Sequence, residues 1–386
     1  MKIGVLGLGK LGLPLAYVYA DAGHEVYGWD VNEDVNSALI NETYTTDEPF
    51  MKDLMREHTV RIASPQWITD ECGAVFIVVP TPSSKLGDFS DEHVVAAVNS
   101  LIEGRTTVTH LLIVLVSTVS PGTCDRISAD LPEDIHLIYA PTLIALGTVI
   151  DNLRGSAIQL IGGSNSWMPL AAKLINTVAP RTPPAFMSYV SAELAKISFN
   201  AFNTMKITFA NIVGQICDRY EGANVSDVLG SIAHDPRIGP QCFTAGAAYG
   251  GPCFPRDNRA FAQAAQGVDT LALKVHQLNE DHIRYICDLA WSEDIDLETF
   301  AILGDTYKEG VHHRIESFGD KLREMMGMQG QEADSLEDTD VLIIALPLHQ
   351  ENLRGKVNPE ARVVDVWRTH GYLADEVREY VAFGRP

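Results

Sequence analysis

Positively charged residues are scarce in this chain. It has 29 lysine and arginine residues against 51 aspartate and glutamate residues, which gives a formal net charge of −22 at pH 7. Nucleic acids and anionic membranes attract proteins through clustered cations. The charge balance therefore argues against nucleic acid and membrane surfaces as partners. An anionic small ligand would need positive side chains placed locally around it.

Paired cysteines and long apolar runs are also missing. The six cysteines are widely spaced, and none forms a CxxC pair. That spacing fits a reduced compartment better than a disulfide framework, and no secretory leader opens the sequence. The apolar run at 111–116 is far too short to span a bilayer. We therefore expect a cytoplasmic protein with no membrane span, and we predict no metal site.

The length and composition predict more than one globular domain. Hydrophobic residues make up 46% of the 386 residues and charged residues 21%, which is an ordinary globular balance. A chain of this length exceeds what one hydrophobic core usually organises. We therefore expect two or three domains.

The first thirty or so residues carry a complete dinucleotide-binding signature. Residues 1–8 read as a buried strand, and 13–22 read as a helix. Between them lies Gly7-Leu8-Gly9-Lys10-Leu11-Gly12, and a second strand at 24–30 ends in Asp30. A glycine turn that follows a strand and opens a helix, with an acid after the next strand, is typical of a Rossmann domain.

Each residue type in this signature has a physical role. Gly7 permits a tight turn, Gly9 lets a pyrophosphate approach, and Gly12 lets the helix pack on the strand, with the helix N-terminus facing the phosphates. Asp30 would accept hydrogen bonds from the adenosine ribose and repel a 2′-phosphate, which favours NAD over NADP. The alternative is a glycine-rich turn that binds nothing. The residues of this segment predicted to contact NAD are Gly7, Gly9, Lys10, Leu11, Gly12 and Asp30.

Further strands place hydroxyl side chains at the same predicted edge of the sheet. Strands at 74–79 and 111–117 end at Pro80-Thr81 and Thr118, and one at 135–139 is followed by Thr142. The carboxyl ends of parallel strands line the ligand crevice in such folds. We predict that Pro80, Thr81 and Thr118 contact the cofactor. Each threonine is equally compatible with a turn or a helix cap.

A second region begins after a proline-rich segment at 180–184, which suggests a domain boundary. The pattern at 191–218 predicts a long helix. Lys196 and Asn200 are four residues apart and so share one helix face. Taken alone, they are compatible with a solvated lysine beside a helical asparagine.

The segment Gly250-Gly251-Pro252-Cys253-Phe254-Pro255-Arg256-Asp257 combines features of a reactive thiol site. Two glycines allow close approach of a ligand, and prolines on both sides restrict the loop. A thiol reacts as the thiolate, which nearby cations favour. A packed, inert cysteine is the alternative, because most cysteines are small buried hydrophobes. A helical region is expected at 258–290.

The last part of the chain repeats the strand–helix alternation. Strands are expected at 300–304, 340–346 and 361–366, with a helix at 315–326. The turn at 304–308 offers a crevice for a nucleotide-like ligand, although an ordinary surface loop is equally compatible. The fold class predicted is α/β, with an N-terminal Rossmann domain, a long central helix and a smaller C-terminal Rossmann-like domain. The predicted divisions are 1–185, 186–295 and 296–386.

Taken together, these motifs resemble the nucleotide-sugar 6-dehydrogenase family, typified by UDP-glucose and GDP-mannose dehydrogenases. The matching segments occur in family order over nearly the whole chain. They are GLGKLGLPLA at 7–16, VPTP at 79–82, STVSPGT at 117–123, AELAKISFNAF at 192–202, DPRIG at 235–239, YGGPCFPRD at 249–257 and ILGDTYK at 302–308.

The resemblance implies two NAD-dependent oxidations that convert a sugar C6 alcohol into a carboxylate. Cys253 would form a thiohemiacetal and then a thioester, Lys196 and Asn200 would stabilise oxyanions, and Asp257 would order a water with help from Thr118. The resemblance further implies a homodimer. The residues implied to bind the nucleotide-linked substrate are Lys196, Arg237, Tyr249, Gly250, Lys308 and Arg314.

The chain departs from the family at two carboxylates. The family segment Pro-Glu-Phe-Leu-x-Glu-Gly is replaced by residues 141–147, which puts Thr142 and Leu146 where the glutamates stand. The lysine that usually precedes the motif aspartate is Arg256. Two alternatives therefore stay open. Beside the full oxidation, the chain could be a diverged enzyme that acts on a related nucleoside or sugar and stops at the aldehyde or deacylates differently, or an inactive binding protein of the same fold.

Overall fold

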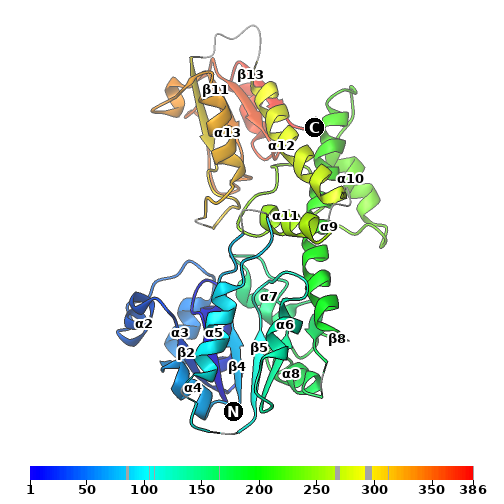
Figure 1. Ribbon diagram of the computed structural model, residues 1–386. Coiled ribbons are helices and arrows are strands. Elements are labelled where there is room, and N and C mark those ends of the chain that lie inside the picture. Colours follow the sequence, from blue (N-terminus) through cyan, green and yellow to red (C-terminus); the bar gives the residue numbers. More distant parts are fainter. Residues whose placement is uncertain are drawn as a thin grey trace. The chain divides into compact units, whose positions relative to one another are not determined.

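In the computed structural model, eight strands of the first half of the chain form one sheet (Figure 1). Their order is β3-β2-β1-β4-β5-β6-β7-β8, and the first six strands are parallel, whereas β7 pairs with β6 in the antiparallel sense. The strands are β1 (Lys2–Leu6), β2 (Glu25–Trp29), β3 (Val60–Ile62), β4 (Ala74–Ile77), β5 (Leu111–Leu115), β6 (Ile135–Tyr139), β7 (Gln159–Gly162) and β8 (Pro184–Met187).

The structure describes residues 1–83, 87–103, 105–107, 109–164, 166–265, 270–291, 298–311 and 313–385. The chain divides into two units, Met1–Ser198 and Phe199–Pro386. The predicted α/β class is confirmed, since each unit contains its own largely parallel sheet with helices packed on it. The finer division at residues 185 and 295 stays a prediction.

The first sheet is buried on both faces, because its apolar residues alternate between two cores. In β5, Leu112 and Val114 belong to one core, and Leu111, Ile113 and Leu115 belong to the other. Successive side chains of a strand point to opposite faces, so a continuous apolar run fills both cores. The helices of this unit are α1 (Gly12–Asp21), α2 (Glu33–Ile40), α3 (Met51–Glu57), α4 (Pro65–Glu71), α5 (Glu92–Ile102), α6 (Thr123–Ala129), α7 (Val149–Gly155) and α8 (Met168–Ile175).

The strand order reverses between β1 and β4. The chain first runs outward through β2 and β3 and then returns to pair β4 with β1, where Ile3 lies opposite Ala74. In an open parallel sheet, ligands bind beyond the carboxyl ends of the strands at such a reversal. The loops after β1, β4 and β5 are therefore the expected cofactor-binding loops.

The long helix predicted at 191–218 is present as α9 (Tyr189–Cys217). It contains no proline, and its first ten residues belong to the first unit. Tyr189 and Ala192 pack into the core beneath β5 and β6, and the Tyr189 hydroxyl donates a hydrogen bond to the main-chain oxygen of Leu137 (2.5 Å). The start of the helix is thereby anchored to the first sheet.

The second unit has a five-stranded parallel sheet in the order β10-β9-β11-β12-β13. The strands are β9 (Thr299–Leu303), β10 (Gln331–Glu332), β11 (Val341–Ile344), β12 (Arg362–Asp365) and β13 (Glu379–Ala382). Its helices are α10 (Val225–Ala233), α11 (Phe254–Ala264), α12 (Leu271–Ala290), α13 (Phe318–Met326), and the 3-10 turns η1 (Leu336–Asp338) and η2 (Gly371–Asp375).

Some expected element ends differ from those observed. The helix expected from residue 315 begins at Phe318, because the Ser317 hydroxyl caps it by accepting a hydrogen bond from the Asp320 amide (3.1 Å). The helical region expected at 258–290 contains the end of α11 and all of α12, and residues 266–269 of that expectation lie outside the described chain. Five strands of the structure were not predicted: β3, β7, β8, β10 and β13. Two of them, β3 and β10, have only three and two residues, too few to show a clear alternation.

Candidate active site

The turn between β1 and α1 requires glycine at two of its three glycine positions. Gly7 has a φ of +91°, and a Cβ there would lie 2.2 Å from the main-chain oxygen of Val78. A Cβ on Gly12 would lie 1.8 Å from the main-chain oxygen of Gly7. A Cβ on Gly9 would meet nothing within 4 Å. The missing side chain of Gly9 therefore leaves open space beside the turn, as a close-approaching ligand needs.

Asp30 lies against this turn. One carboxylate oxygen accepts a hydrogen bond from the Leu8 amide (2.7 Å), and the other accepts one from the Asn32 amide (2.9 Å). The first amides of a helix have no partner within it, and no side chain caps the start of α1, where Lys10 is exposed and Leu11 half-buried. A positive helix end beside a fixed carboxylate suits a pyrophosphate and a ribose hydroxyl, so these residues fit NAD.

The loops after β4 and β5 are tied to each other. The Thr81 hydroxyl donates to the main-chain oxygen of Thr118 (2.7 Å). The Ser117 hydroxyl accepts from the Val79 amide (2.9 Å) and donates to the Val79 oxygen (2.7 Å). Thr81 is buried, whereas Pro80 is exposed and Thr118 half-buried. The sequence interpretation missed Ser117, which fixes this edge of the sheet beside Thr118.

Lys196 contacts the loop at 141–147, in which Thr142 and Leu146 replace the two family glutamates. Its side chain is largely buried, and its ammonium group donates a hydrogen bond to the main-chain oxygen of Thr142 (2.8 Å). A few residues earlier on α9, the buried carboxylate of Glu193 accepts from the amides of Gly122 (2.6 Å) and Cys124 (2.8 Å). The start of α9 thus fixes the loops that follow both β5 and β6.

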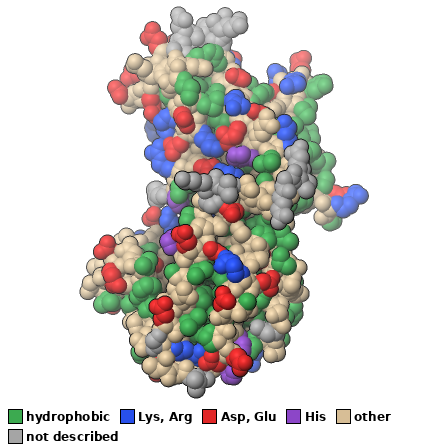
Figure 2. All heavy atoms as spheres, viewed as in Figure 1, with side chains coloured by type: hydrophobic (Ala, Val, Ile, Leu, Met, Phe, Trp, Pro, Cys, Tyr) green, Lys and Arg blue, Asp and Glu red, His purple; other side chains and the backbone are tan. Residues whose placement is uncertain are grey.

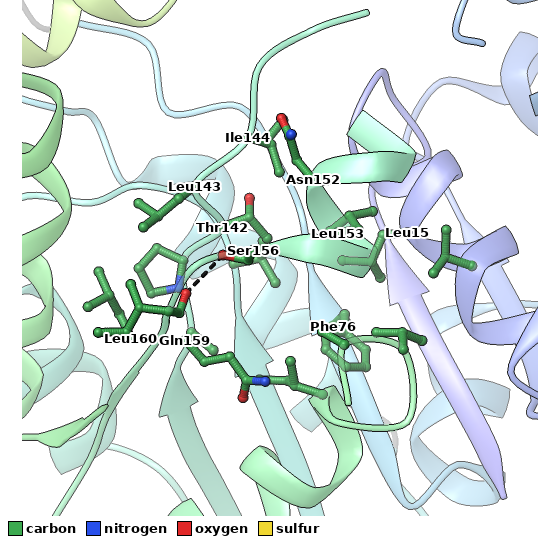
Figure 3. Close-up of a pocket in the computed structure, with 18 of the residues that line it drawn as sticks. Leu15, Phe76, Thr142, Leu143, Ile144, Asn152, Leu153, Ser156, Gln159 and Leu160 are labelled. Atoms are coloured by element: carbon green, nitrogen blue, oxygen red, sulfur yellow. Dashed lines mark hydrogen bonds between the residues drawn. The ribbon is translucent and has the colours of Figure 1, made fainter. Parts of the chain in front are cut away.

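Thr142 also lines an apolar cavity of about 60 Å³ in the first unit (Figure 3). Leu143, Leu153 and Leu160 are among its other lining residues, and none of the residues predicted to bind NAD lines it. The family has a glutamate carboxylate at position 142. In this chain Thr142 stands there and forms part of the wall of the apolar cavity. Leu146, the second replaced position, is half-buried.

A carboxylate from outside this loop holds its end. Glu48 accepts hydrogen bonds from the amides of Gly147 (3.0 Å), Val149 (2.6 Å) and Ile150 (3.4 Å). It therefore binds the start of α7 immediately after Leu146. The partners are about a hundred positions apart in the sequence, and no local pattern signals such a pairing, so the sequence interpretation missed Glu48.

In the second unit, the glycine–cysteine loop has no room for side chains at its two glycines. A Cβ on Gly250 would lie 2.1 Å from the main-chain oxygen of Glu316. Gly251 has a φ of +82°, and a Cβ there would lie 2.6 Å from the ring of Tyr307. Tyr307 and the main chain of Glu316 therefore shape the loop that ends at Cys253.

Cys253 differs from the other five cysteines in its exposure. It is exposed at the N-cap of α11, whereas Cys242 is half-buried and the remaining four are buried. Burial raises the pKa of Cys72 and of Cys287 to about 12, and it also raises the pKa of Cys242. The positive end of a helix stabilises a thiolate, so Cys253 is the cysteine best placed to react.

One helical turn after Cys253, Asp257 is completely buried. Its carboxylate accepts a hydrogen bond from the side-chain amide of Asn200 on α9. The Arg256 guanidinium donates through Nε to the other oxygen (3.0 Å) and forms an ion pair with it. A buried carboxylate with a cation and an amide as partners is held in one orientation. The structure thus brings the predicted catalytic residues Asn200 and Asp257 into direct contact.

The residues predicted to bind substrate lie in different settings. Arg237 is exposed and pairs with Asp235 (2.6 Å), and Arg314 pairs with Asp305 (2.9 Å) and with Asp320. Lys308 is exposed. On the face shown in Figure 2, acidic and basic side chains are interspersed. A bound diphosphate would have to share Arg314 with two carboxylates.

Tyr249 is buried rather than exposed to a ligand. Its hydroxyl accepts a hydrogen bond from the Asn258 side-chain amide (2.8 Å) and lies 3.4 Å from Nδ1 of His276. Burial raises the pKa of Tyr249. The hydroxyl is therefore occupied by protein partners, and the ring is buried in the second unit.

The reversing parallel sheet, the glycine turn and the acid after β2 define a dinucleotide-binding domain of the Rossmann type. The NAD-binding domain of the UDP-glucose/GDP-mannose dehydrogenase family matches residues 1–176, and the central domain of that family matches residues 190–281. The chain belongs to the UDP-glucose/GDP-mannose dehydrogenase family. It is an NAD-dependent oxidoreductase, and the predicted family and cofactor are confirmed.

Individual relatives agree with this assignment. The UDP-glucose 6-dehydrogenase of Rhizobium meliloti is 31% identical over 80% of this chain and 75% of its own. The UDP-N-acetyl-D-mannosamine dehydrogenase of Methanococcus maripaludis is 28% identical over 82% of this chain and 74% of its own. A solved UDP-glucose dehydrogenase from Pyrobaculum islandicum superposes with a TM-score of 0.85, at 25% identity, over 100% of this chain and 98% of its own. No helix among the described residues combines the length and hydropathy needed to cross a bilayer.

Proposed function

We propose that this chain oxidises the C6 primary alcohol of a nucleotide sugar in NAD-dependent steps, with Cys253 as the nucleophile. The observation that carries the proposal is the arrangement at α11. An exposed thiol lies at the start of the helix, and the buried Asp257 lies one turn later in contact with Asn200. An inactive fold would need none of these three residues. Both relatives described above are named for UDP-linked sugars, so UDP sugars are the first candidates.

The chemistry follows from the residue types. NAD, when bound at the glycine turn, accepts hydride. The first oxidation removes a hydride from C6 and a proton from the hydroxyl, leaving an aldehyde. The Cys253 thiolate then adds to the aldehyde carbon and gives a thiohemiacetal, which loses a second hydride to become a thioester. Attack of water on the thioester carbon forms the acid and releases the thiolate.

The other side chains act as donors and orienters in this scheme. Lys196 and Asn200 stabilise the oxyanions in this scheme, because preorganised donors lower the energy of developing negative charge. Asp257 orders the attacking water with help from Thr118. Lys196, Arg237, Lys308 and Arg314, with the loop at Tyr249 and Gly250, bind the nucleotide-linked substrate.

The second candidate function is a variant of this reaction in which the last, hydrolytic step is slow or absent. The loop at 141–147 favours this candidate. Thr142 covers an apolar cavity, and neither it nor Leu146 can accept a proton near neutral pH. General-base catalysis typically contributes roughly 10²–10⁴-fold. Thioester hydrolysis is therefore slow relative to oxidation, or the reaction ends at the aldehyde.

The second unit also presents an apolar stripe on α9 that fits a homodimer. Phe199, Phe202, Phe209 and Ile216 recur at helical spacing and are each more than 40% exposed. Exposed apolar stripes of this kind mark protein interfaces. We propose that a second copy of the chain covers this stripe.

The function is tested by NADH formation with UDP-glucose, UDP-N-acetylmannosamine and GDP-mannose, with products identified by mass. We expect NADH with at least one UDP sugar. Cys253→Ala should bind NAD normally and form no acid. If Cys253→Ala forms acid at the rate of the unaltered protein, the covalent route is wrong. If the unaltered protein binds a nucleotide sugar but reduces no NAD, the proposed oxidation of that sugar is wrong.

A further inference from the structure

The backbone that leads into the cysteine loop is held from two helices of the second unit. Asn211 on α9 donates from its side-chain amide to the main-chain oxygen of Ala247 (3.1 Å). Its side-chain oxygen accepts from the Gly246 amide (2.8 Å). The side chain is 1% exposed. Asn211 therefore bonds the backbone of two consecutive residues as both donor and acceptor.

Asn279 on α12 makes a similar pair of hydrogen bonds to the backbone of Tyr249, three residues after Gly246. Its oxygen accepts from the Tyr249 amide (2.8 Å), and its amide donates to the Tyr249 oxygen (3.0 Å). It is also 1% exposed. Two bonds to one residue fix both the position and the orientation of its peptide groups. Gly250 follows at once, and Cys253 lies four residues after Tyr249.

His282 adds a third contact from α12. Its Nε2 lies 2.8 Å from the main-chain oxygen of Gly246, and its Nδ1 lies 3.1 Å from the side-chain nitrogen of Gln215. A carbonyl only accepts, so Nε2 carries the proton and Nδ1 accepts from Gln215. Burial lowers the pKa of His282 to about 4, which keeps the ring neutral and this pattern intact at pH 7.

We propose that Asn211 and Asn279 are positioning residues that hold the 246–249 backbone so that Cys253 stays at the N-terminus of α11. The proposal rests on the proposed function in one respect, that Cys253 is the nucleophile. Neither asparagine acts on the substrate. They act through the loop, and a displacement of about 1 Å of a reacting group costs roughly 10²-fold in rate.

We call the pair Asn211 and Asn279, with their bonds to the 246–249 backbone, the clamp. The substitutions Asn211→Asp and Asn279→Asp test the clamp with little change in side-chain size. Each keeps the acceptor but replaces the donor with a carboxylate oxygen that faces a carbonyl oxygen. Asn358→Asp is the matched control, because Asn358 also donates to a main-chain oxygen (Thr339, 3.0 Å) and accepts from an amide (Glu360, 3.0 Å) in the same unit. It lies outside the cysteine loop.

The readout is the rate of Cys253 alkylation by iodoacetamide as a function of pH, followed by peptide mass. We expect the two clamp variants to change the pH profile of Cys253 alkylation and to lower its rate at pH 7 by roughly tenfold. The kcat for NADH formation should fall by roughly 10²-fold, with the Kd for NAD unchanged. Asn358→Asp should behave like the unaltered protein. Folded clamp variants with an unshifted alkylation profile would overturn the proposal.

Hydrogen exchange in the unaltered protein provides a second test that needs no variant. The amides of Gly246 and Tyr249 should exchange far more slowly than those of exposed loop residues, because the two asparagines accept from them. Fast exchange at both amides would contradict the clamp even if the variants failed to fold. If Cys253 is alkylated no faster than Cys242, the nucleophile role fails, and the exchange result still decides whether the clamp exists.

Discussion

The ammonium group of Lys196 donates a hydrogen bond to the main-chain oxygen of Thr142 over 2.8 Å. The bond depends on the backbone and not on the threonine side chain. The loop that follows β6 therefore keeps its connection to α9 although the family carboxylate is absent. Substitution of the Thr142 side chain tests the chemistry of this position with the lysine contact intact.

We predict that thioester hydrolysis limits turnover. Rapid mixing of the protein with substrate and NAD should give a burst of NADH, and a mass adduct on Cys253 should outlast it. Thr142→Glu should shorten the lifetime of the adduct by roughly 10-fold or more, because it returns a base that can activate water. Thr142→Gln is the control of equal size without a base. Steady production of two NADH per substrate with neither burst nor adduct would show that the lost carboxylates are no bottleneck.

Asp30 should set the preference for NAD. The charged carboxylate is fixed by the Leu8 and Asn32 amides, where it would repel a 2′-phosphate. Asp30→Asn keeps an acceptor but removes the charge, so the ratio of NADP to NAD dissociation constants should fall by roughly tenfold, about 1.4 kcal/mol. Asp34→Asn, an exposed acid on α2, should leave the ratio unchanged. Equal affinity of the unaltered protein for both cofactors is the result that rules out this role.

The apolar stripe on α9 should determine the oligomeric state. Phe202 is 56% exposed, and a charge there would be buried in the proposed interface. Phe202→Glu should convert a particle of twice the 42.2 kDa chain mass into one of the chain mass, measured by light scattering. Leu273→Glu, on an exposed apolar residue of α12, is the control. A monomeric unaltered protein at micromolar concentration would refute the interface.

His282 should make the second unit sensitive to acid. Its folded pKa of about 4 lies below the unfolded value of 6.5, so between these pH values only the unfolded chain binds the proton. The free energy of unfolding should therefore fall as the pH drops from 6.5 to 4, by roughly 3 kcal/mol from this group. Denaturant unfolding of His282→Gln should depend less on pH over that range. His234→Gln, at an exposed histidine, should show the same pH dependence as the unaltered protein.

Features determined by neighbouring residues were predictable from the sequence. The glycine turn, the helix after it and Asp30 lie within one continuous segment, and the structure gives Gly7 and Gly12 the close contacts that exclude a side chain. Short apolar runs predicted β5 and β6, and near-helical spacing of apolar residues in a stretch without proline predicted α9. Short-range sterics and periodicity decide these features, so a local pattern suffices.

Other features were decided by the tertiary structure alone. The glycine–proline segment singled out Cys253 in the sequence, but only the structure shows that it is exposed while Cys242 is half-buried and the other four cysteines are buried. Glu48 binds the start of α7 about a hundred residues away, and Asn279 binds the backbone of Tyr249 from another helix. These pairings depend on which helix packs against which loop and in what register. A side chain that bonds a distant backbone leaves no mark on the residues around it, so only the packed structure reveals it.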